Sequence, residues 1–103
     1  MKKLTDLEIQ RRLKNYPDWD YYDDALHTEF EFDNFKDCMS AISRIAFECE
    51  ALNHHPDWRN VYNILYITLS THDADGITEL DFQLLEAIEK IVEEKFDLRP
   101  KSL

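Results

Sequence analysis

The chain has 103 residues, of which 44% are hydrophobic, 13% aromatic and 33% charged. This length and balance are typical of one globular domain, and they exclude a disordered linker, so we expect residues 1–103 to form a single domain. The 22 acidic side chains outnumber the 12 basic ones, for a net charge of −10. Such a charge disfavours direct binding of nucleic acid or of an anionic membrane surface.

Several features indicate a reducing, cytoplasmic location. No apolar run reaches the length that crosses a bilayer, and the first residues turn acidic where a secretory signal would turn hydrophobic. Cys38 and Cys49 fall in one predicted helix, where a rise of about 1.5 Å per residue separates them by about 16 Å. A disulfide needs Cα atoms within about 7 Å, so we interpret both cysteines as reduced core residues.

The first predicted element is a helix over about residues 6–14. Thr5 is its predicted N-cap, and Glu8 follows three residues later, which is the spacing of a capping box. Ile9 and Leu13 stand four residues apart and form a narrow apolar stripe. A stripe of this width is suited to lying on a sheet.

Two strands are predicted next, near residues 19–22 and over residues 25–32. A turn at Asp23 and Asp24 joins them. The second run alternates with period two, as a strand with one wet face does. Its buried side is predicted to carry Leu26, Thr28, Phe30 and Phe32, and its wet side His27, Glu29 and Glu31.

A long helix is predicted from Asn34 to about Leu52, with Asp33 as its N-cap. Pro56 ends this helical stretch, because the residue before a proline is pushed away from helical backbone angles. Apolar residues recur along the helix at steps of three and four, and they predict its buried stripe. The members of this predicted stripe are Phe35, Met39, Ile42, Ala46, Cys49 and Leu52.

Two further strands and a last helix complete the predicted fold. The segment 58–71 is rich in strand-forming residues, and Asn60 and Asn63 offer a turn within it. The second of these strands covers residues 64–70. Thr78 is the predicted N-cap of the last helix, whose buried stripe is Leu84, Ile88, Ile91 and Val92. The predicted class is α+β in the order α-β-β-α-β-β-α, with a four-stranded antiparallel sheet and three helices packed on one face.

Three of the four histidines fall in two short segments that hold most of the chemically active side chains. His54 and His55 follow the long helix, and His72 follows the last predicted strand. Imidazole exchanges protons near neutral pH, so such a set can supply a proton donor and a proton acceptor together. The carboxylates of Glu50 and Asp81 are candidates for orienting these rings.

Simpler interpretations stand beside this one. Histidines such as His54 and His55 are also favoured by the negative dipole at a helix C-terminus, and His72 is typical of an exposed loop. Asp81 is equally typical of a first helical turn, where an acid stabilises the N-terminus. A metal-assisted hydrolase using His54, His72 and a carboxylate is a further alternative. No His-x-x-x-His spacing, phosphate-binding glycine loop or dinucleotide motif is present, so we predict no metal and no cofactor.

The spacing of these residues resembles the signature of the pterin-4a-carbinolamine dehydratase family. The resemblance rests on Glu50, His54, His55, Pro56, Tyr62, His72 and Asp81, and on the runs 53–58 and 66–72. It implies a hydro-lyase that dehydrates 4a-hydroxytetrahydropterins to quinonoid dihydropterins without a cofactor or a metal. By the same resemblance, this reaction recycles the tetrahydrobiopterin-type cofactor of aromatic amino acid hydroxylases.

The resemblance also assigns roles to individual residues. The catalytic set it implies is His54, His55 and His72. The substrate-binding set it implies is Glu50, Pro56, Trp58, Thr71, Asp73, Ala74 and Asp81, with Trp58 flanking the flat pterin. Which histidine is the acid and which the base is left open.

The resemblance further implies a homo-oligomer, either a dimer or a tetramer. Animal members of the family also act as dimerisation cofactors for a homeodomain transcription factor. A non-catalytic dimerisation or coactivator module with a protein partner is therefore an alternative function. The presence of all three histidines favours an enzyme, since an interaction-only protein has no need of them.

Overall fold

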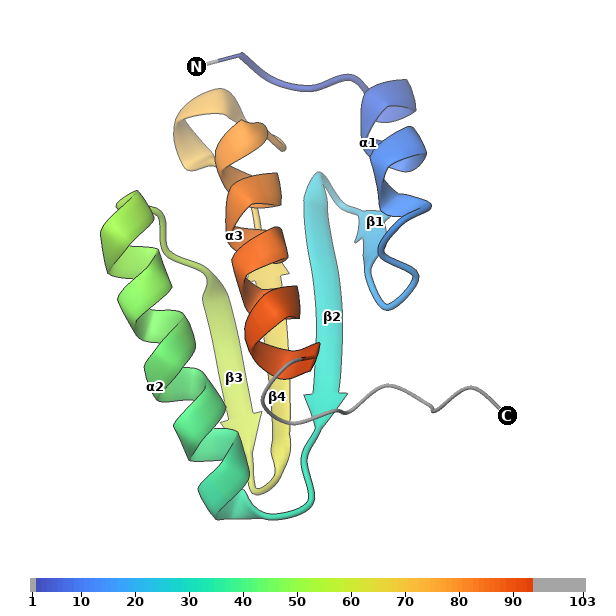
Figure 1. The fold of residues 1–103 in the computed structure, drawn as a ribbon. Helices are drawn as coiled ribbons and strands as arrows, with labels where there is room; N and C mark the ends of the chain where they lie inside the picture. The colour runs from blue at the N-terminus through green and yellow to red at the C-terminus, as the bar shows by residue number, and fades with distance from the viewer. Residues whose placement is uncertain (1, 94–103) are drawn as a thin grey trace.

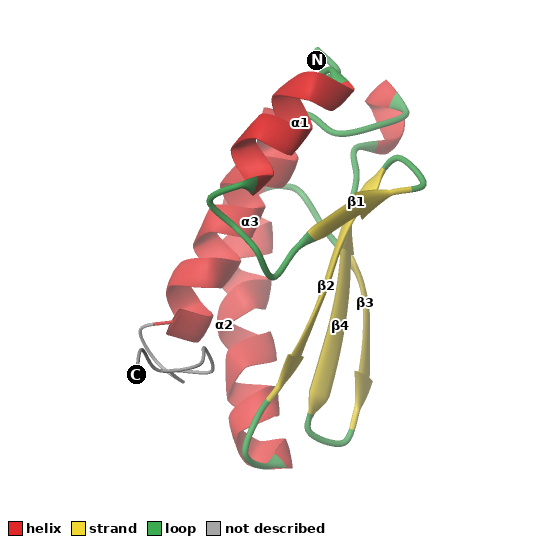
Figure 2. Cartoon of the chain, turned by 90° about the vertical axis from the view of Figure 1, so that its right-hand side faces the viewer, coloured by secondary structure: helices red, strands yellow, loops and turns green. Residues whose placement is uncertain are grey.

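The computed structural model describes residues 2–93, whose helices and strands form two layers (Figures 1 and 2). One layer is a four-stranded sheet, and the three α-helices lie together on one of its faces (Figure 2). The elements in chain order are α1 (Asp6–Leu13), β1 (Asp20–Tyr22), β2 (Ala25–Glu31), α2 (Phe35–Leu52), β3 (Asp57–Val61), β4 (Ile64–Leu69), the 3₁₀ helix η1 (His72–Ala74) and α3 (Glu79–Ile91). This arrangement confirms the predicted α+β fold.

The sheet is antiparallel throughout, in the spatial order β1-β2-β4-β3. Its central pair, β2 and β4, runs in register from Leu26 opposite Leu69 to Glu31 opposite Ile64. The alternation predicted for β2 is confirmed, because its apolar side is buried and Glu31 is exposed. The predicted turn before β2 is also present, as the left-handed φ angles of Asp23 and Asp24 show.

The helices α1 and α3 both begin with capping boxes, of which the sequence predicted the one at Thr5 and, at α3, only Thr78 as the N-cap. At α1, the backbone N–H of Glu8 donates to Thr5 Oγ1 at 3.1 Å, and that of Thr5 donates to Glu8 Oε1 at 2.9 Å. At α3, Thr78 and Asp81 form the same reciprocal pair. Each box satisfies backbone donors that the first helical turn leaves without a partner, and so specifies where the helix starts.

Two predictions for α2 are wrong. Its N-cap is Asn34 rather than Asp33, because Asn34 Oδ1 accepts the backbone N–H of Asp37 at 2.8 Å. The predicted buried stripe is wrong at Phe35 and Met39, which are 47% and 37% exposed. It is correct at Cys49, and Ile42 and Leu52 are partly buried against the core. The buried residues of α2 are Cys38, Ala41, Ile45 and Cys49. These four residues have the same helical spacing, and the side chains of Cys38, Ala41 and Cys49 are smaller than those of Phe35 and Met39, so the helix packs closely against its neighbours.

The core fills the space between the sheet and the helices. It includes the predicted stripe of α3, that is, Leu84, Ile88, Ile91 and Val92. Cys38 and Cys49 are buried in it as free thiols, which confirms their interpretation as reduced core residues. Burial raises the pKa of the Cys49 thiol to about 11, because the charged thiolate is poorly solvated there.

Two apolar residues of α1 test which face of that helix meets the core. Ile9 is fully buried and Leu7 is 64% exposed, although alanine removes the same number of carbon atoms from each. We expect Ile9→Ala to lower the free energy of unfolding by about 2–5 kcal/mol, because it leaves a cavity. Leu7→Ala should stay within about 0.5 kcal/mol of the wild type. Urea melts measure both values, and equal losses would contradict the assigned face.

Candidate active site

His54 and His55 reach the site because α2 ends in a sharp reversal of the chain. Asn53 caps the helix in the left-handed conformation, with φ 50° and ψ 44°. The backbone N–H of His54 then donates to the carbonyl oxygen of Cys49 at 3.0 Å. Asparagine tolerates left-handed angles better than most residues, so it suits this position. The reversal holds both histidines between the end of α2 and the start of β3.

His72 is carried by a short closed loop between β4 and α3. The backbone N–H of Thr71 donates to the carbonyl oxygen of Gly76 at 2.8 Å, and that of Gly76 donates back at 3.4 Å. The next residue, Ile77, accepts a backbone hydrogen bond from Leu4 at 2.8 Å. The loop is therefore held at its base, and the ends of α2 and β4 meet the start of α3 at one end of the molecule (Figure 1).

These segments enclose a cavity of about 330 Å³. It is lined by Asn53, His54, His55, Ser70, Thr71, His72, Asp73 and Leu80. The structure thus brings together all three histidines of the predicted catalytic set and two of the predicted substrate-binding residues, Thr71 and Asp73. Asn53, Ser70 and Leu80 were not predicted, because their side chains carry no recognisable signal and only their place in the fold brings them here.

The other predicted site residues do not line this cavity. Asp81 is fully buried beside it, and Glu50 reaches it only through His55. Trp58 is partly buried and packs against the hydrophobic core. Pro56 and Ala74 are half-buried next to lining residues in sequence.

The pair formed by His54 and Asp81 is the buried part of the site. The ring Nε2 of His54 lies 2.6 Å from Asp81 Oδ1, with side-chain exposures of 10% and 0%. The second oxygen of Asp81 accepts the hydroxyl of Thr71 at 2.7 Å and the backbone N–H of Thr78 at 2.9 Å. As a carboxylate, Asp81 accepts all three of these hydrogen bonds. Because Asp81 Oδ1 accepts, the ring of His54 carries its proton on Nε2.

The other two imidazoles are exposed. His55 Nε2 donates to Glu50 Oε2 at 2.7 Å, in a pair whose side chains are 56% and 76% exposed. Solvent weakens such a pair, so it orients His55 less firmly than Asp81 orients His54. The ring of His72 has no hydrogen-bond partner within residues 2–93. The three rings thus share a cavity but differ in burial and in anchoring.

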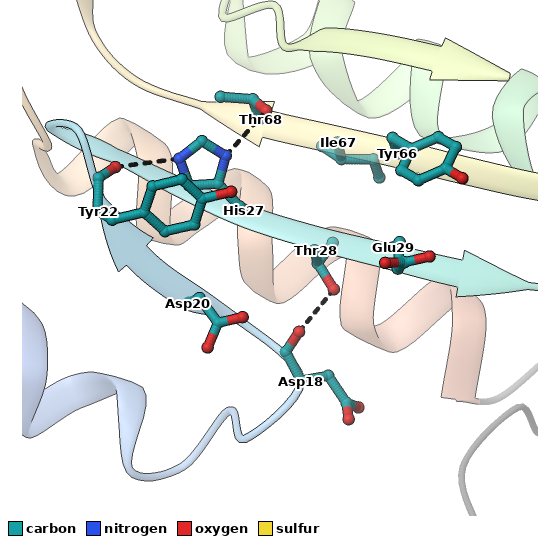
Figure 3. Close-up of a pocket in the computed structure, with 9 residues that line it drawn as sticks. All are labelled: Asp18, Asp20, Tyr22, His27, Thr28, Glu29, Tyr66, Ile67 and Thr68. Carbon is teal, nitrogen blue, oxygen red and sulfur yellow. Dashed lines mark hydrogen bonds between the residues drawn. The ribbon is translucent and has the colours of Figure 1, made fainter.

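The fourth histidine lies elsewhere, in a cavity of about 320 Å³ on the uncovered face of the sheet (Figure 3). His27 stacks on Tyr22 with ring centroids 3.8 Å apart. Its Nε2 donates to the carbonyl oxygen of Tyr22 at 3.0 Å, and its Nδ1 accepts from the hydroxyl of Thr68 at 3.2 Å. Both ring nitrogens are occupied, so His27 joins β1, β2 and β4 instead of offering a free proton site.

Residues 2–93 contain no group of three or more His, Cys, Asp or Glu side chains placed to hold a metal ion. No helix in the same range combines the length and the apolar character needed to cross a bilayer.

Comparison with known proteins gives a consistent result. Residues 2–91 match the family model described as pterin 4 alpha carbinolamine dehydratase. A Christiangramia forsetii protein that carries the name of a pterin-4-alpha-carbinolamine dehydratase is 56% identical over 93 residues, covering 90% of this chain and 96% of its own. A Burkholderia vietnamiensis protein with the same name is 41% identical over 91 residues, covering 86% of this chain and 89% of its own.

A solved structure agrees in fold. The crystal structure of a transcriptional coactivator/pterin dehydratase from Brucella melitensis has a TM-score of 0.85 and 33% identity, covering 87% of this chain and 98% of that one. Together with the histidine cavity, these matches define a hydro-lyase acting on a pterin. The chain belongs to the pterin-4a-carbinolamine dehydratase family, which confirms the resemblance of its motif and assigns it that dehydratase activity.

Two acids in the first turn of α3, Glu79 and Asp81, allow the contribution of the hydrogen bonds of Asp81 to be distinguished from that of its charge at the helix N-terminus. Glu79 is exposed and Asp81 is fully buried, although either one adds negative charge to the same turn. We expect Asp81→Asn to lower the free energy of unfolding by about 1–3 kcal/mol, because the amide group donates where the carboxylate only accepts. Glu79→Gln should cost at most about 1 kcal/mol.

Denaturant melts of the two variants provide the comparison. A similar small loss of unfolding free energy in both variants would mean that Asp81 acts only as a charge at the helix N-terminus.

Proposed function

We propose that the cavity of His54, His55 and His72 binds a 4a-hydroxytetrahydropterin and that these histidines catalyse its dehydration. In this reaction the bond between the carbinolamine carbon and its hydroxyl oxygen breaks, and the leaving oxygen takes a proton to become water. A ring nitrogen loses a proton as the quinonoid double bonds form. One acid and one base are needed, and no metal or cofactor. The convergence of three imidazoles on one cavity is the observation that carries this proposal.

Within this proposal, His54 is the base. Its Nε2–H is donated to Asp81, so the lone pair of the neutral ring lies on Nδ1. Nδ1 has no hydrogen-bond partner within residues 2–93 and is left for the substrate. The charge of Asp81 stabilises the imidazolium that forms when Nδ1 takes the proton, as an aspartate does for the histidine of a serine-protease triad.

The proton for the leaving hydroxide comes from one of the exposed rings, His55 or His72. Both line the same cavity as His54, and the exposure of both gives the product water a path to solvent. Glu50 orients His55 through their hydrogen bond. Of the remaining members of the predicted set, Thr71 and Asp73 line the cavity and are the proposed contacts of the flat pterin, whereas Ala74, Pro56 and Trp58 lie outside its lining.

The cellular role that follows from this chemistry is cofactor recycling. The product, a quinonoid dihydropterin, differs from the tetrahydropterin only by a two-electron reduction. Dehydration therefore returns the carbinolamine left by aromatic amino acid hydroxylases to a form that a reductase accepts.

We also propose that the chain forms a homo-oligomer through the exposed side of α2. Phe35, Met39 and Phe47 are 47%, 37% and 78% exposed, and none of them belongs to the buried side of the helix. Tyr62 extends this surface, because its ring stacks on Phe35 with centroids 6.5 Å apart. Exposed apolar surface of this kind is typical of an interaction site. A second copy of the chain is the proposed partner, and a different protein, as in a coactivator, is the alternative.

The catalytic proposal predicts a large loss of turnover without the histidines. We expect His54→Ala and His72→Ala each to lower the dehydration rate by about 10² or more, the usual contribution of a general acid or base. The assay supplies the 4a-hydroxytetrahydropterin enzymatically and follows its dehydration, and circular dichroism checks that each variant is folded. His27→Ala is the matched control, since that ring lies outside the cavity.

Wild-type rates in the folded His54→Ala and His72→Ala variants would contradict the catalytic role of these rings. The same assay after exhaustive dialysis against EDTA tests the metal-assisted hydrolase. We expect full activity there, and a loss that returns when metal is added would favour that alternative.

The oligomer proposal predicts that assembly depends on α2. In sedimentation velocity we expect the wild type to run as a dimer or a tetramer and Phe47→Asp to shift towards the monomer, because the charge is poorly tolerated in an apolar interface. Leu7→Asp is the control, since Leu7 is 64% exposed but lies on α1. A monomeric wild type, or an unchanged Phe47→Asp assembly, would leave α2 free for a different partner.

A further inference from the structure

A chain of buried hydroxyl groups leads from the start of α3 to the histidine cavity. Thr78 is fully buried, and its Oγ1 lies 2.8 Å from Oγ1 of Thr71. Thr71 Oγ1 lies 2.7 Å from Asp81 Oδ2, and Asp81 Oδ1 lies 2.6 Å from His54 Nε2. The chain therefore connects Thr78, which does not line the cavity, with His54, which does.

The hydrogen atoms along this chain have one consistent arrangement. Each threonine hydroxyl has a single proton to donate, and an ionised carboxylate donates none. Thr71 therefore donates its proton to Asp81, and the proton between the two hydroxyls comes from Thr78. Thr78 Oγ1 in turn accepts the backbone N–H of Leu80 at 3.3 Å. The direction of every hydrogen bond from α3 to His54 is set.

We propose that Thr78 is a positioning residue for the dehydration, a role that rests on the proposed function of His54 as the base. Its hydroxyl keeps the proton of Thr71 directed at Asp81, and Asp81 keeps His54 in the tautomer with a free lone pair on Nδ1. Without the Thr78 hydroxyl, Oγ1 of Thr71 no longer accepts a hydrogen bond. The hydroxyl proton of Thr71 can then turn away from Asp81. The carboxylate then loses one of the contacts that fix its rotation, and the ring of His54 is held less firmly.

Thr78 is also the N-cap of α3, so a loss of the cap has to be separated from a loss of positioning. The chain offers a matched control in Thr5, which forms the same capping box at α1 but is exposed. Thr5→Ala removes a cap alone, whereas Thr78→Ala removes a cap together with the hydroxyl chain. Thr78→Ser keeps both the cap and the hydroxyl.

Steady-state kinetics with the enzymatically supplied substrate provide the first test. We expect Thr78→Ala to lower kcat about tenfold with little change in KM, because the base is misaligned while the pocket is kept. Thr78→Ser should restore kcat to within about twofold of the wild type, and Thr5→Ala should leave it unchanged. If Thr78→Ala does not fold, Thr71→Val interrupts the same chain while keeping the cap of α3, and the same loss of kcat is expected.

Nuclear magnetic resonance provides a readout that does not depend on turnover. The ¹⁵N shifts of the His54 ring should report a proton on Nε2 in the wild type and in Thr78→Ser. In Thr78→Ala they should move towards a mixture of both tautomers.

The proposal is overturned if a folded Thr78→Ala protein keeps both its kcat and its His54 tautomer, or if Thr5→Ala loses as much kcat. A failure of the proposed function appears differently. In that case His54→Ala retains full turnover, while the tautomer of His54 still depends on Thr78.

Discussion

The hydrogen bond between Asp81 and His54 joins three parts of the fold that are distant in sequence. A buried carboxylate is costly unless donors compensate its charge, and Asp81 receives them from the end of α2, the end of β4 and the start of α3. Each donor stands where an element stops or begins. A shift in any one of these boundaries would remove one of the three donors that compensate this charge, so the caps that define the boundaries also position Asp81.

The two oxygens of Asp81 have different partners. Oδ2 accepts the backbone N–H of Thr78 and completes the capping box, whereas Oδ1 faces His54. The sequence allows Asp81 to be interpreted either as a helix-start acid or as a site residue, and the structure shows that the interpretations are compatible. One carboxylate starts the helix and orients the imidazole.

Local patterns predicted the parts of this protein that local interactions determine. The capping box at Thr5, the N-cap at Thr78 and the alternation of β2 depend on residues only a few positions apart, and these predictions were correct. The buried side of α2 was only partly correct, because the exposed Phe35 and Met39 follow the same helical spacing as the buried residues and only packing selects between them. The same holds for the site. The motif pointed to the histidines, but the pairing of His54 with Asp81 depends on the left-handed turn at Asn53.

The two sides of α2 allow catalysis and self-association to coexist. Its buried side ends at Cys49, whose carbonyl oxygen accepts the backbone N–H of His54 and so holds the histidine cavity in place. Its exposed side carries Phe35, Met39 and Phe47, none of which lines that cavity. A partner bound along the exposed side therefore does not need to displace the histidines. An enzyme and a protein-binding module are alternatives for the sequence, but the exposed side of α2 lies outside the cavity lining, so the two proposed roles do not compete for one surface.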